Sequence, residues 1–356
     1  MSQSQFSNVL FGMGNPLLDI AANVSTEFAV EKYGAEFGNA ILANEKNIGV
    51  YEDLTTNFPV QYMAGGATMN VFRVFQWMLN KGPGNCNFLG CIGNDHFGEE
   101  LTKQASKDGV NVRFMTTQEK PTGTCAVLVV EEEKERCLIA NLSAANEFKH
   151  EHLLKDEQLT AMKQASFYYI SGFFITVSPK SMLHVAEHAL QENKVFMMNL
   201  SAMFICQFFL DPVKELLPYC DYLFANEDEA RALSKALEWG TDDVLKIAEK
   251  AAVLEKKNTK RNRIVVFTQS SLPICIAIQD PESDTGVRSF QVPVEKLPKE
   301  KVVDTNGAGD SFCGGFISQL VQGKELDTCI KAGSYAARYI IQQSGCQFTG
   351  EPDFTA

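Results

Sequence analysis

A short run of small residues that ends in a carboxylate lies near the C-terminal end of the chain: Asp304-Thr305-Asn306-Gly307-Ala308-Gly309-Asp310. Its glycines and alanine let backbone N–H groups approach an anion. The apolar spacing after Asp310 predicts a helix whose N-terminus favours negative charge at the same place. Asp310 would repel a bound phosphate, so it suits removal of a proton from a hydroxyl that attacks phosphate. An Asp that merely caps a helix after a glycine turn is the alternative, and these residues alone leave both open.

A second polar motif follows a predicted first strand, Asn8–Gly12, and reads Gly12-Met13-Gly14-Asn15-Pro16-Leu17-Leu18-Asp19. Leu17 stands where a dinucleotide fingerprint needs its third glycine. The motif instead fits a strand end that presents Asn15 and Asp19 to a cleft. A carboxylate there can accept hydrogen bonds from two vicinal hydroxyls, such as those of a ribose. A turn-forming Asn with a surface Asp is the other reading.

A glycine pair, Gly65-Gly66, leads into a helix predicted to start near Thr68. The pair would bring bare backbone near a ligand, and Asn70 would face that ligand from the first helical turn. A glycine-rich helix start with Thr68 as N-cap is the alternative. The polar residues of this helix are expected to face away from its apolar stripe: Arg73, Gln76 and Asn80.

From about residue 165, short apolar runs alternate with helical patterns, which is typical of βαβ units around a parallel sheet. The predicted strands are Phe167–Gly172, Val195–Leu200, Tyr222–Ala225, Arg263–Thr268 and Ile274–Ile278. The predicted helices between them are Pro179–Gln191, Glu227–Lys235 and Asp243–Leu254. Residues 20–64 and 113–142 lack good helical periods and are expected to form a small β-rich lid. Residues 1–19, 65–112 and 143–356 are then the large domain.

The composition narrows the class of partner. A net charge of −12 and a pI near 5.0 argue against nucleic-acid or membrane partners. We therefore expect small-molecule partners, and we also expect a monomer. The first residues lack a basic, apolar signal segment, and ten irregularly spaced cysteines read as reduced thiols. These features predict a cytoplasmic protein and leave a nuclear fraction open. The most basic run, 256–263, is predicted to be a solvated loop.

The three motifs, in this order and at these separations, resemble the ribokinase (carbohydrate kinase) family. Further segments match the branch of that family that phosphorylates adenosine: Pro121–Cys125, Leu138–Leu142, Gly172–Phe174 and Asn199–Ala202. The resemblance covers residues 8–354. It implies an α/β fold, a three-layer α/β/α sandwich with a small β-rich lid. It also implies phosphorylation of adenosine by Mg-ATP at the 5′-hydroxyl, giving AMP and ADP.

The resemblance assigns roles residue by residue. Asp310 is the expected base, and Asn306, Gly307, Ala308 and Gly309 form the anion hole, with Arg136 moving over the phosphates from the lid. The ribose is expected to lie against five polar or glycine positions: Asn15, Asp19, Gly65, Gly66 and Asn70. The purine slot is expected to be apolar: Leu17, Leu42, Cys125, Leu138, Phe173 and Phe204.

Fewer residues match the family at the expected binding site for ATP and Mg²⁺. Asn226 and Glu229 match an N-x-x-E motif that organises Mg²⁺ and its waters, although the same residues also make a good helix cap. The expected contacts with ATP come from Thr268, Gln269 and Ser334. The chain departs from the family at three positions: Ser270, where related kinases usually have glycine, Ser334, which is often His, and Ala40, which is a glutamine in the mammalian-type enzyme.

Two other functions remain open on the sequence. One is a related kinase for another nucleoside or a sugar, although the apolar Phe173 and Phe204 disfavour a free sugar. The other is a catalytically silent purine-binding protein on the same fold, which would have no use for Asp310. Because neither a P-loop nor protein-kinase motifs occur, phosphoryl transfer would have to use the Asp310 loop.

Overall fold

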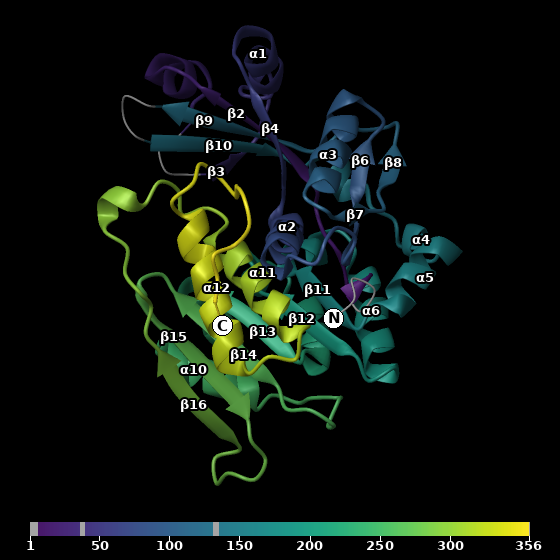
Figure 1. The fold of residues 1–356 in the computed structure, drawn as a ribbon, viewed down its shortest axis with the longest axis vertical. Helices are drawn as coiled ribbons and strands as arrows, with labels where there is room; N and C mark the ends of the chain where they lie inside the picture. The colour runs from purple at the N-terminus through teal and green to yellow at the C-terminus, as the bar shows by residue number, and fades with distance from the viewer. Residues whose placement is uncertain (1–5, 36–39, 131–134, 356) are drawn as a thin grey trace.

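The chain forms a large α/β body with a smaller β-rich lid on one end (Figure 1). The computed structural model describes residues 6–35, 40–130 and 135–355. The strands of the large sheet, in spatial order, are β16 (Val287–Val292), β15 (Leu272–Gln279), β14 (Ile264–Gln269), β13 (Tyr222–Asn226), β12 (Val195–Asn199), β11 (Phe167–Ser171), β1 (Leu10–Met13), β5 (Cys86–Leu89) and β7 (Asn111–Val112). The strands from β14 to β7 are mutually parallel, and β15 and β16 extend the sheet as an antiparallel hairpin.

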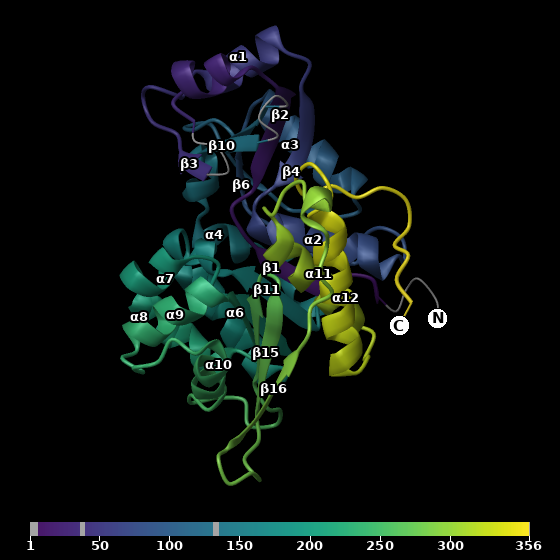
Figure 2. The same ribbon diagram turned by 90° about the vertical axis from the view of Figure 1, so that its left-hand side faces the viewer.

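Helices cover both faces of this sheet, so that the large body has three layers (Figure 2). One face carries α4 (His150–Leu153), α5 (Asp156–Gln164), α6 (Pro179–Gln191), α7 (Met203–Phe208), α8 (Leu210–Leu216), α9 (Glu227–Ala236) and α10 (Val244–Ala252). The other face carries α2 (Ala67–Leu79), α11 (Ala308–Leu320) and α12 (Leu326–Ile340). This arrangement confirms the predicted three-layer fold.

Successive side chains of each strand point to opposite faces of the sheet, so each strand contributes to the hydrophobic core on either side. In β11, the side chains of Tyr168 and Ile170 belong to the core on the α6 side of the sheet, whereas Tyr169 belongs to the core on the side of α2 and α11. All three are fully buried, as a parallel strand covered on both faces requires. The five strands and three helices predicted after residue 165 are all present, with ends within two residues of the prediction.

The lid contains a five-stranded sheet of β3 (Ala40–Leu42), β10 (Glu135–Asn141), β9 (Thr124–Val130), β2 (Leu17–Asn23) and β4 (Gln61–Gly65). One face is covered by α1 (Val50–Asn57) and a helical turn, Glu27–Lys32. The expectation that residues 20–64 lack helices was therefore wrong. The buried residues of α1 are only Val50, Tyr51 and Leu54, too few to give a clear helical period. Strand β2 also begins at Leu17, three residues earlier than the predicted boundary of the lid.

Smaller elements connect the lid to the large body. Helix α3 (His96–Lys107) packs against β4, β2 and β7, next to a two-stranded sheet of β6 (Cys91–Gly93) and β8 (Met115–Thr117). All ten cysteines lie in the described ranges, where they are buried and form no disulfide, as predicted for reduced thiols. Within the described ranges, no helix has the length and apolar character that crossing a membrane requires.

The polar face predicted for α2 was wrong for Arg73 and Gln76, whereas Asn80 is exposed as predicted. Arg73 and Gln76 are only 5% and 6% exposed. Gln76 donates to the Gly82 carbonyl and accepts from the Asn85 amide, so this side chain organises the turn before β5. The prediction failed because α2 packs against the sheet, α11 and the C-terminal segment, and a single-face helical pattern does not account for the additional neighbours.

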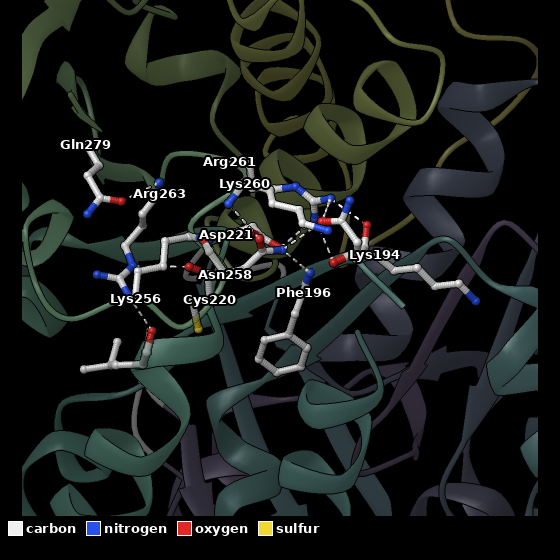
Figure 3. Close-up of polar contacts among 12 residues, drawn as sticks. Lys194, Phe196, Cys220, Asp221, Lys256, Asn258, Lys260, Arg261, Arg263 and Gln279 are labelled. Atoms are coloured by element: carbon white, nitrogen blue, oxygen red, sulfur yellow. Dashed lines mark hydrogen bonds and ion pairs between the residues drawn. The ribbon is translucent and has the colours of Figure 1, made fainter. Parts of the chain in front are cut away.

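The basic run 256–263 is also not the solvated loop that was predicted (Figure 3). Lys256 and Arg261 both pair with the buried Asp221 carboxylate, at 2.8 and 3.2 Å. Arg263 is fully buried and donates to five backbone carbonyls, which belong to Cys220, Ala251, Leu254, Leu217 and Glu255. These cations therefore tie the loop to the amino ends of β13 and β14.

Candidate active site

The Asp304–Asp310 loop leads directly into α11. Gly307 has a left-handed backbone, φ 76°, which a side chain would strain. The buried Asp304 carboxylate accepts from the backbone N–H groups of Asn306 and Gly345, at 2.9 and 3.2 Å. No described heavy atom lies within 4 Å of a Cβ built on Gly309. The loop thus leaves open space at the helix N-terminus, where backbone N–H groups favour an anion.

Asp310 lies in the first turn of α11. Its carboxylate accepts a hydrogen bond of 3.1 Å from the side-chain amide of Asn70, in the first turn of α2. Burial raises the pKa of Asp310 to about 6, and the Asn70 hydrogen bond opposes that rise. A carboxylate with this pKa is mostly ionised at neutral pH and is a stronger base than an ordinary Asp. The arrangement is that of a general base beside an anion-binding helix end.

The ribose-binding residues predicted from the second and third motifs meet at the junction of β2, β4 and α2. A Cβ on Gly65 would lie 2.5 Å from Asp19 Oδ1, so the Asp19 carboxylate packs directly on this glycine. Gly66 has φ 96°, and a Cβ there would lie 2.1 Å from the Asn15 carbonyl oxygen. Glycine is therefore required at both positions, because a side chain would clash with the Asp19 carboxylate at Gly65 and with the Asn15 backbone at Gly66.

Two buried polar atoms at this junction have no hydrogen-bond partner among the described residues, Asn15 Oδ1 and Asn70 Oδ1. Unpaired buried acceptors are rare in folded proteins, and here they fit a polar ligand. Burial raises the pKa of Asp19 to about 7, with the Arg73 charge lowering it and the Asp304 charge raising it. A hydroxyl-bearing ligand would supply donors for all three groups.

The residues predicted for the lid side of the purine slot share one face of the lid sheet. Leu17 and Asp19 are two residues apart on β2 and therefore lie on the same face of the sheet. The register places Cys125 of β9 beside Asp19. On β10, Leu138 pairs with Val127, and Ala140 pairs with both Cys125 and Leu42. Apart from Asp19, this face is apolar and only partly covered, and Leu42 is 66% exposed.

The predicted aromatic residues lie on the large body. Phe173 follows β11 and Phe204 lies in α7, and their ring centroids are 6.1 Å apart. Ser201 anchors the Phe173 turn, because its hydroxyl accepts from the Gly172 N–H at 3.0 Å. Phe204 is 39% exposed, which leaves ring surface free for a flat ligand. The sequence alone did not point to Ser201, whose φ of 68° marks a tight turn after β12.

Asn226 and Glu229 form the helix cap that was the alternative reading of their motif. Asn226 Oδ1 accepts from the Glu229 N–H, and Glu229 Oε2 accepts from the Asn226 N–H. Glu229 is 6% exposed. Burial raises the pKa of Glu229 to about 7, and the Asp310 charge adds to that rise. The cap therefore also places a second acidic group within electrostatic reach of Asp310.

The residues predicted to contact ATP lie around the end of β14 and on α12. The side chain of Gln269 is buried and donates to the Pro273 carbonyl at 2.6 Å, so it stabilises the β14–β15 turn and does not face the surface. Thr268 and Ser334 are partly exposed. Ser270 has φ 50°, a left-handed conformation that explains why glycine is the usual residue at this position.

Arg136 was predicted to contact the phosphates, and Ala40 marks a departure from the family near the nucleoside. The Arg136 backbone pairs with Val129, but its side chain lies outside the described residues, as does that of Ala40. Cys346 was not predicted to be near the site. The C-terminal segment that contains it lies against the Asp304–Asp310 loop and α11, because the Gly345 N–H donates to Asp304 at 3.2 Å and the Cys346 thiol lies 3.9 Å from the Ser311 hydroxyl.

Comparison with known proteins gives concordant results. The model of the pfkB family of carbohydrate kinases matches residues 29–353. Adenosine kinase 2 of Arabidopsis thaliana is 50% identical over 99% of both chains. The crystal structure of Anopheles gambiae adenosine kinase in complex with P1,P4-di(adenosine-5) tetraphosphate is 46% identical, with a TM-score of 0.86 over 98% of this chain and 99% of that one. Schistosoma mansoni adenosine kinase in complex with adenosine is 34% identical, with a TM-score of 0.85 over 97% and 98%. The chain belongs to the pfkB family of carbohydrate kinases, within its adenosine kinase branch.

Proposed function

We propose that this protein transfers the γ-phosphate of ATP to the 5′-hydroxyl of adenosine, giving AMP and ADP. The hydrogen-bonded Asn70–Asp310 pair beside the open N-terminus of α11 carries the proposal. It supplies a base for the attacking hydroxyl and an anion site for the transferring group within one helical turn. The relatives named above are adenosine kinases, and one of them was solved with adenosine bound.

The acceptor side of the site suits a nucleoside. The Asp19 carboxylate accepts hydrogen bonds from the two vicinal ribose hydroxyls, and Asn15 and Asn70 offer further acceptors at this polar end of the site. The purine ring lies between the apolar lid face, which includes Leu138, and the Phe173–Phe204 pair of the large body. Closing the lid on this arrangement would exclude the water that could otherwise hydrolyse ATP.

ATP occupies the other side of the α11 N-terminus in this proposal, near Thr268 and Ser334. The ligand of the Anopheles gambiae structure supports two nucleoside subsites, because it carries an adenosine at each end of a phosphate chain. Arg136 is assigned to the phosphates from the resemblance to the family, and its backbone pairs with Val129 in the lid sheet. Asp310 accepts the proton from the 5′-hydroxyl as the new O–P bond forms and the bond to the leaving ADP oxygen breaks.

Mg²⁺ would neutralise charge on the phosphates when bound. The donor chemistry fits such an ion, because the carboxylates of Glu229 and Asp310, which lie within electrostatic reach of each other, offer the oxygen ligands that Mg²⁺ prefers. No cluster of three potential metal ligands occurs in the described part of the chain, and Mg²⁺ commonly keeps several waters and binds through the substrate phosphates. Asn226 and Glu229 are assigned to orient those waters. A cytoplasmic, monomeric protein remains our prediction.

The test is ADP release from Mg-ATP with adenosine, inosine, guanosine, cytidine or ribose as acceptor. Strong preference for adenosine is the expected result, and preference for another acceptor would contradict the assignment of the base pocket. Asp310→Asn should lower kcat about 10²–10⁴-fold while adenosine still binds in calorimetry. Full activity of this variant would show that Asp310 is not the base.

A further inference from the structure

Arg73 occupies a buried position one turn after Asn70 on α2. Its Nε donates to the Asp108 carboxylate at 2.6 Å, and its Nη1 donates to the Ala64 carbonyl at 2.6 Å. Its guanidinium carbon lies 5.5 Å from the ring centroid of Phe348. One side chain thereby joins α2 to the end of lid strand β4, the C-cap of α3 and the C-terminal segment.

The Ala64 contact places Arg73 next to the ribose end of the site. Ala64 immediately precedes Gly65, whose backbone forms the surface on which the Asp19 carboxylate packs. By holding the Ala64 carbonyl, the guanidinium fixes the peptide that leads into Gly65. The position of the Asp19 carboxylate therefore depends on Arg73 through this peptide, without direct contact with the ligand.

The charge of Arg73 has a second effect on Asp19. Burial and the Asp304 charge raise the pKa of Asp19, and the Arg73 charge lowers it. The other titratable groups that face Asp19 are the thiols of Cys125 and Cys346, both with raised pKa values that keep them neutral near pH 7. Asp19 can accept hydrogen bonds from two hydroxyls only as a carboxylate. Without the guanidinium, Asp19 would be protonated over more of the neutral range.

We propose that Arg73 is a positioning residue. It holds Asp19 where this carboxylate accepts hydrogen bonds from the ribose hydroxyls of the nucleoside. Asn70 and Arg73 are three residues apart and lie on neighbouring positions of one helix surface. Asn70 orients Asp310 at the 5′ end of the acceptor, and Arg73 orients Asp19 at the 2′ and 3′ hydroxyls. Helix α2 thus fixes the spacing between the two carboxylates. This inference rests on the proposed function.

The test compares Arg73→Gln, Arg73→Lys and Asp108→Asn with wild type. Arg288→Gln is the matched control, because Arg288 is exposed on β16. Steady-state kcat and KM are measured for adenosine, 2′-deoxyadenosine and ATP from pH 5.5 to 8.5, together with thermal unfolding. Adenosine and 2′-deoxyadenosine differ only in one hydroxyl, so the ratio of their kcat/KM values reports on the Asp19 contacts.

Arg73→Gln should raise KM for adenosine about 10–100-fold, as expected for lost hydrogen bonds to a charged group, with KM for ATP changed less than about threefold. The preference for adenosine over 2′-deoxyadenosine should shrink towards unity, and the acidic limb of kcat/KM should move to higher pH. Arg73→Lys should lie between wild type and Gln, because it keeps the charge but loses the fork of donors. Asp108→Asn should lower the unfolding temperature and leave the preference intact.

An unchanged preference in Arg73→Gln, with only a lower unfolding temperature, would overturn the proposal and leave Arg73 as a structural ion pair. If Arg73→Gln does not fold, Arg73→Lys decides by the same ratio. A preference of wild type for an acceptor other than adenosine would be a failure of the proposed function, and the outcome is separable because it does not involve the variants.

Discussion

The side-chain amide of Asn70 lies 3.1 Å from the Asp310 carboxylate, and this hydrogen bond joins the first turn of α2 to the first turn of α11. The two helices pack along their length on one face of the sheet. Asp310, the proposed base, is therefore held by a neighbouring helix, α2, which also holds the end of lid strand β4 through Arg73. The pKa of Asp310 is set by two opposed effects, burial and the hydrogen bond from Asn70.

The pH dependence of kcat/KM should show two ionisations on its acidic side, because Asp19, with a pKa of about 7, and Asp310, with a pKa of about 6, must both be carboxylates. Below the pKa of Asp310 the fall should steepen by a further factor of about ten per pH unit, because protonated Asp310 cannot accept the hydroxyl proton. Asn70→Ala removes a hydrogen bond that lowers the pKa of Asp310, so its acidic limb should move to higher pH. A limb that keeps its position in Asn70→Ala would argue against Asp310 as the titrating base.

Gly65→Ala should weaken adenosine binding selectively. The new methyl would lie 2.5 Å from Asp19 Oδ1 and displace this carboxylate. We expect KM for adenosine to rise about 10–100-fold, equivalent to roughly 1.5–3 kcal/mol, with KM for ATP nearly unchanged. Gly49→Ala in the lid is the matched control, since its nearest neighbour would be 3.9 Å away. Equal effects on both substrates would contradict the assignment of Gly65 to the ribose end.

Gly309→Ala should separate activity from stability. No described heavy atom lies within 4 Å of the new methyl, so the unfolding temperature should stay within about 1 °C of wild type. The methyl would project into the space assigned to the transferring phosphoryl group. Misplacement of that group by about 1 Å should lower kcat roughly 10–100-fold. Normal kcat would indicate that the phosphoryl group lies elsewhere.

Ser270→Gly should stabilise the protein slightly. Ser270 has φ 50°, a conformation that costs a non-glycine residue about 1–2 kcal/mol. Glycine avoids this strain but loses more entropy on folding, so the expected net gain is up to about 1 kcal/mol. Urea unfolding gives the change, and Ser271→Gly, at the next position of the same turn, is the control. A loss of stability in Ser270→Gly would mean that the serine side chain makes a contact that offsets its backbone strain.

Arg263→Met should destabilise the fold without changing the kinetics of the folded protein. Five backbone carbonyls would lose their donor in a fully buried place, which we expect to cost about 3–5 kcal/mol. Arg263 directly precedes the amino end of β14, whereas the site lies at the carboxyl ends of the strands. Urea unfolding and KM for adenosine measure the two effects. A changed KM would indicate that the cluster communicates with the site.

Local sequence determined the elements and the identity of the chemical groups. Apolar runs and helical periods predicted the strands and helices after residue 165, since each pattern depends on neighbours a few residues apart. The Asp304–Asp310 run likewise placed a carboxylate beside a glycine loop at a helix start, and the structure has this arrangement. The lid face that carries Cys125 and Leu138 follows from strand alternation once the register is known.

Only the tertiary structure decided which polar side chains are buried and what they hold. Arg73, Arg263 and Gln269 were predicted to face solvent or a ligand, yet each is buried and hydrogen-bonded to a backbone carbonyl. Their partners come from segments that a local pattern does not connect, such as Asp108 and Phe348 for Arg73. A buried cation is tolerated only where such partners replace its water. Sequence spacing therefore determined the Asp304–Asp310 loop, whereas long-range packing decided how the two carboxylates Asp19 and Asp310 are held at their separation.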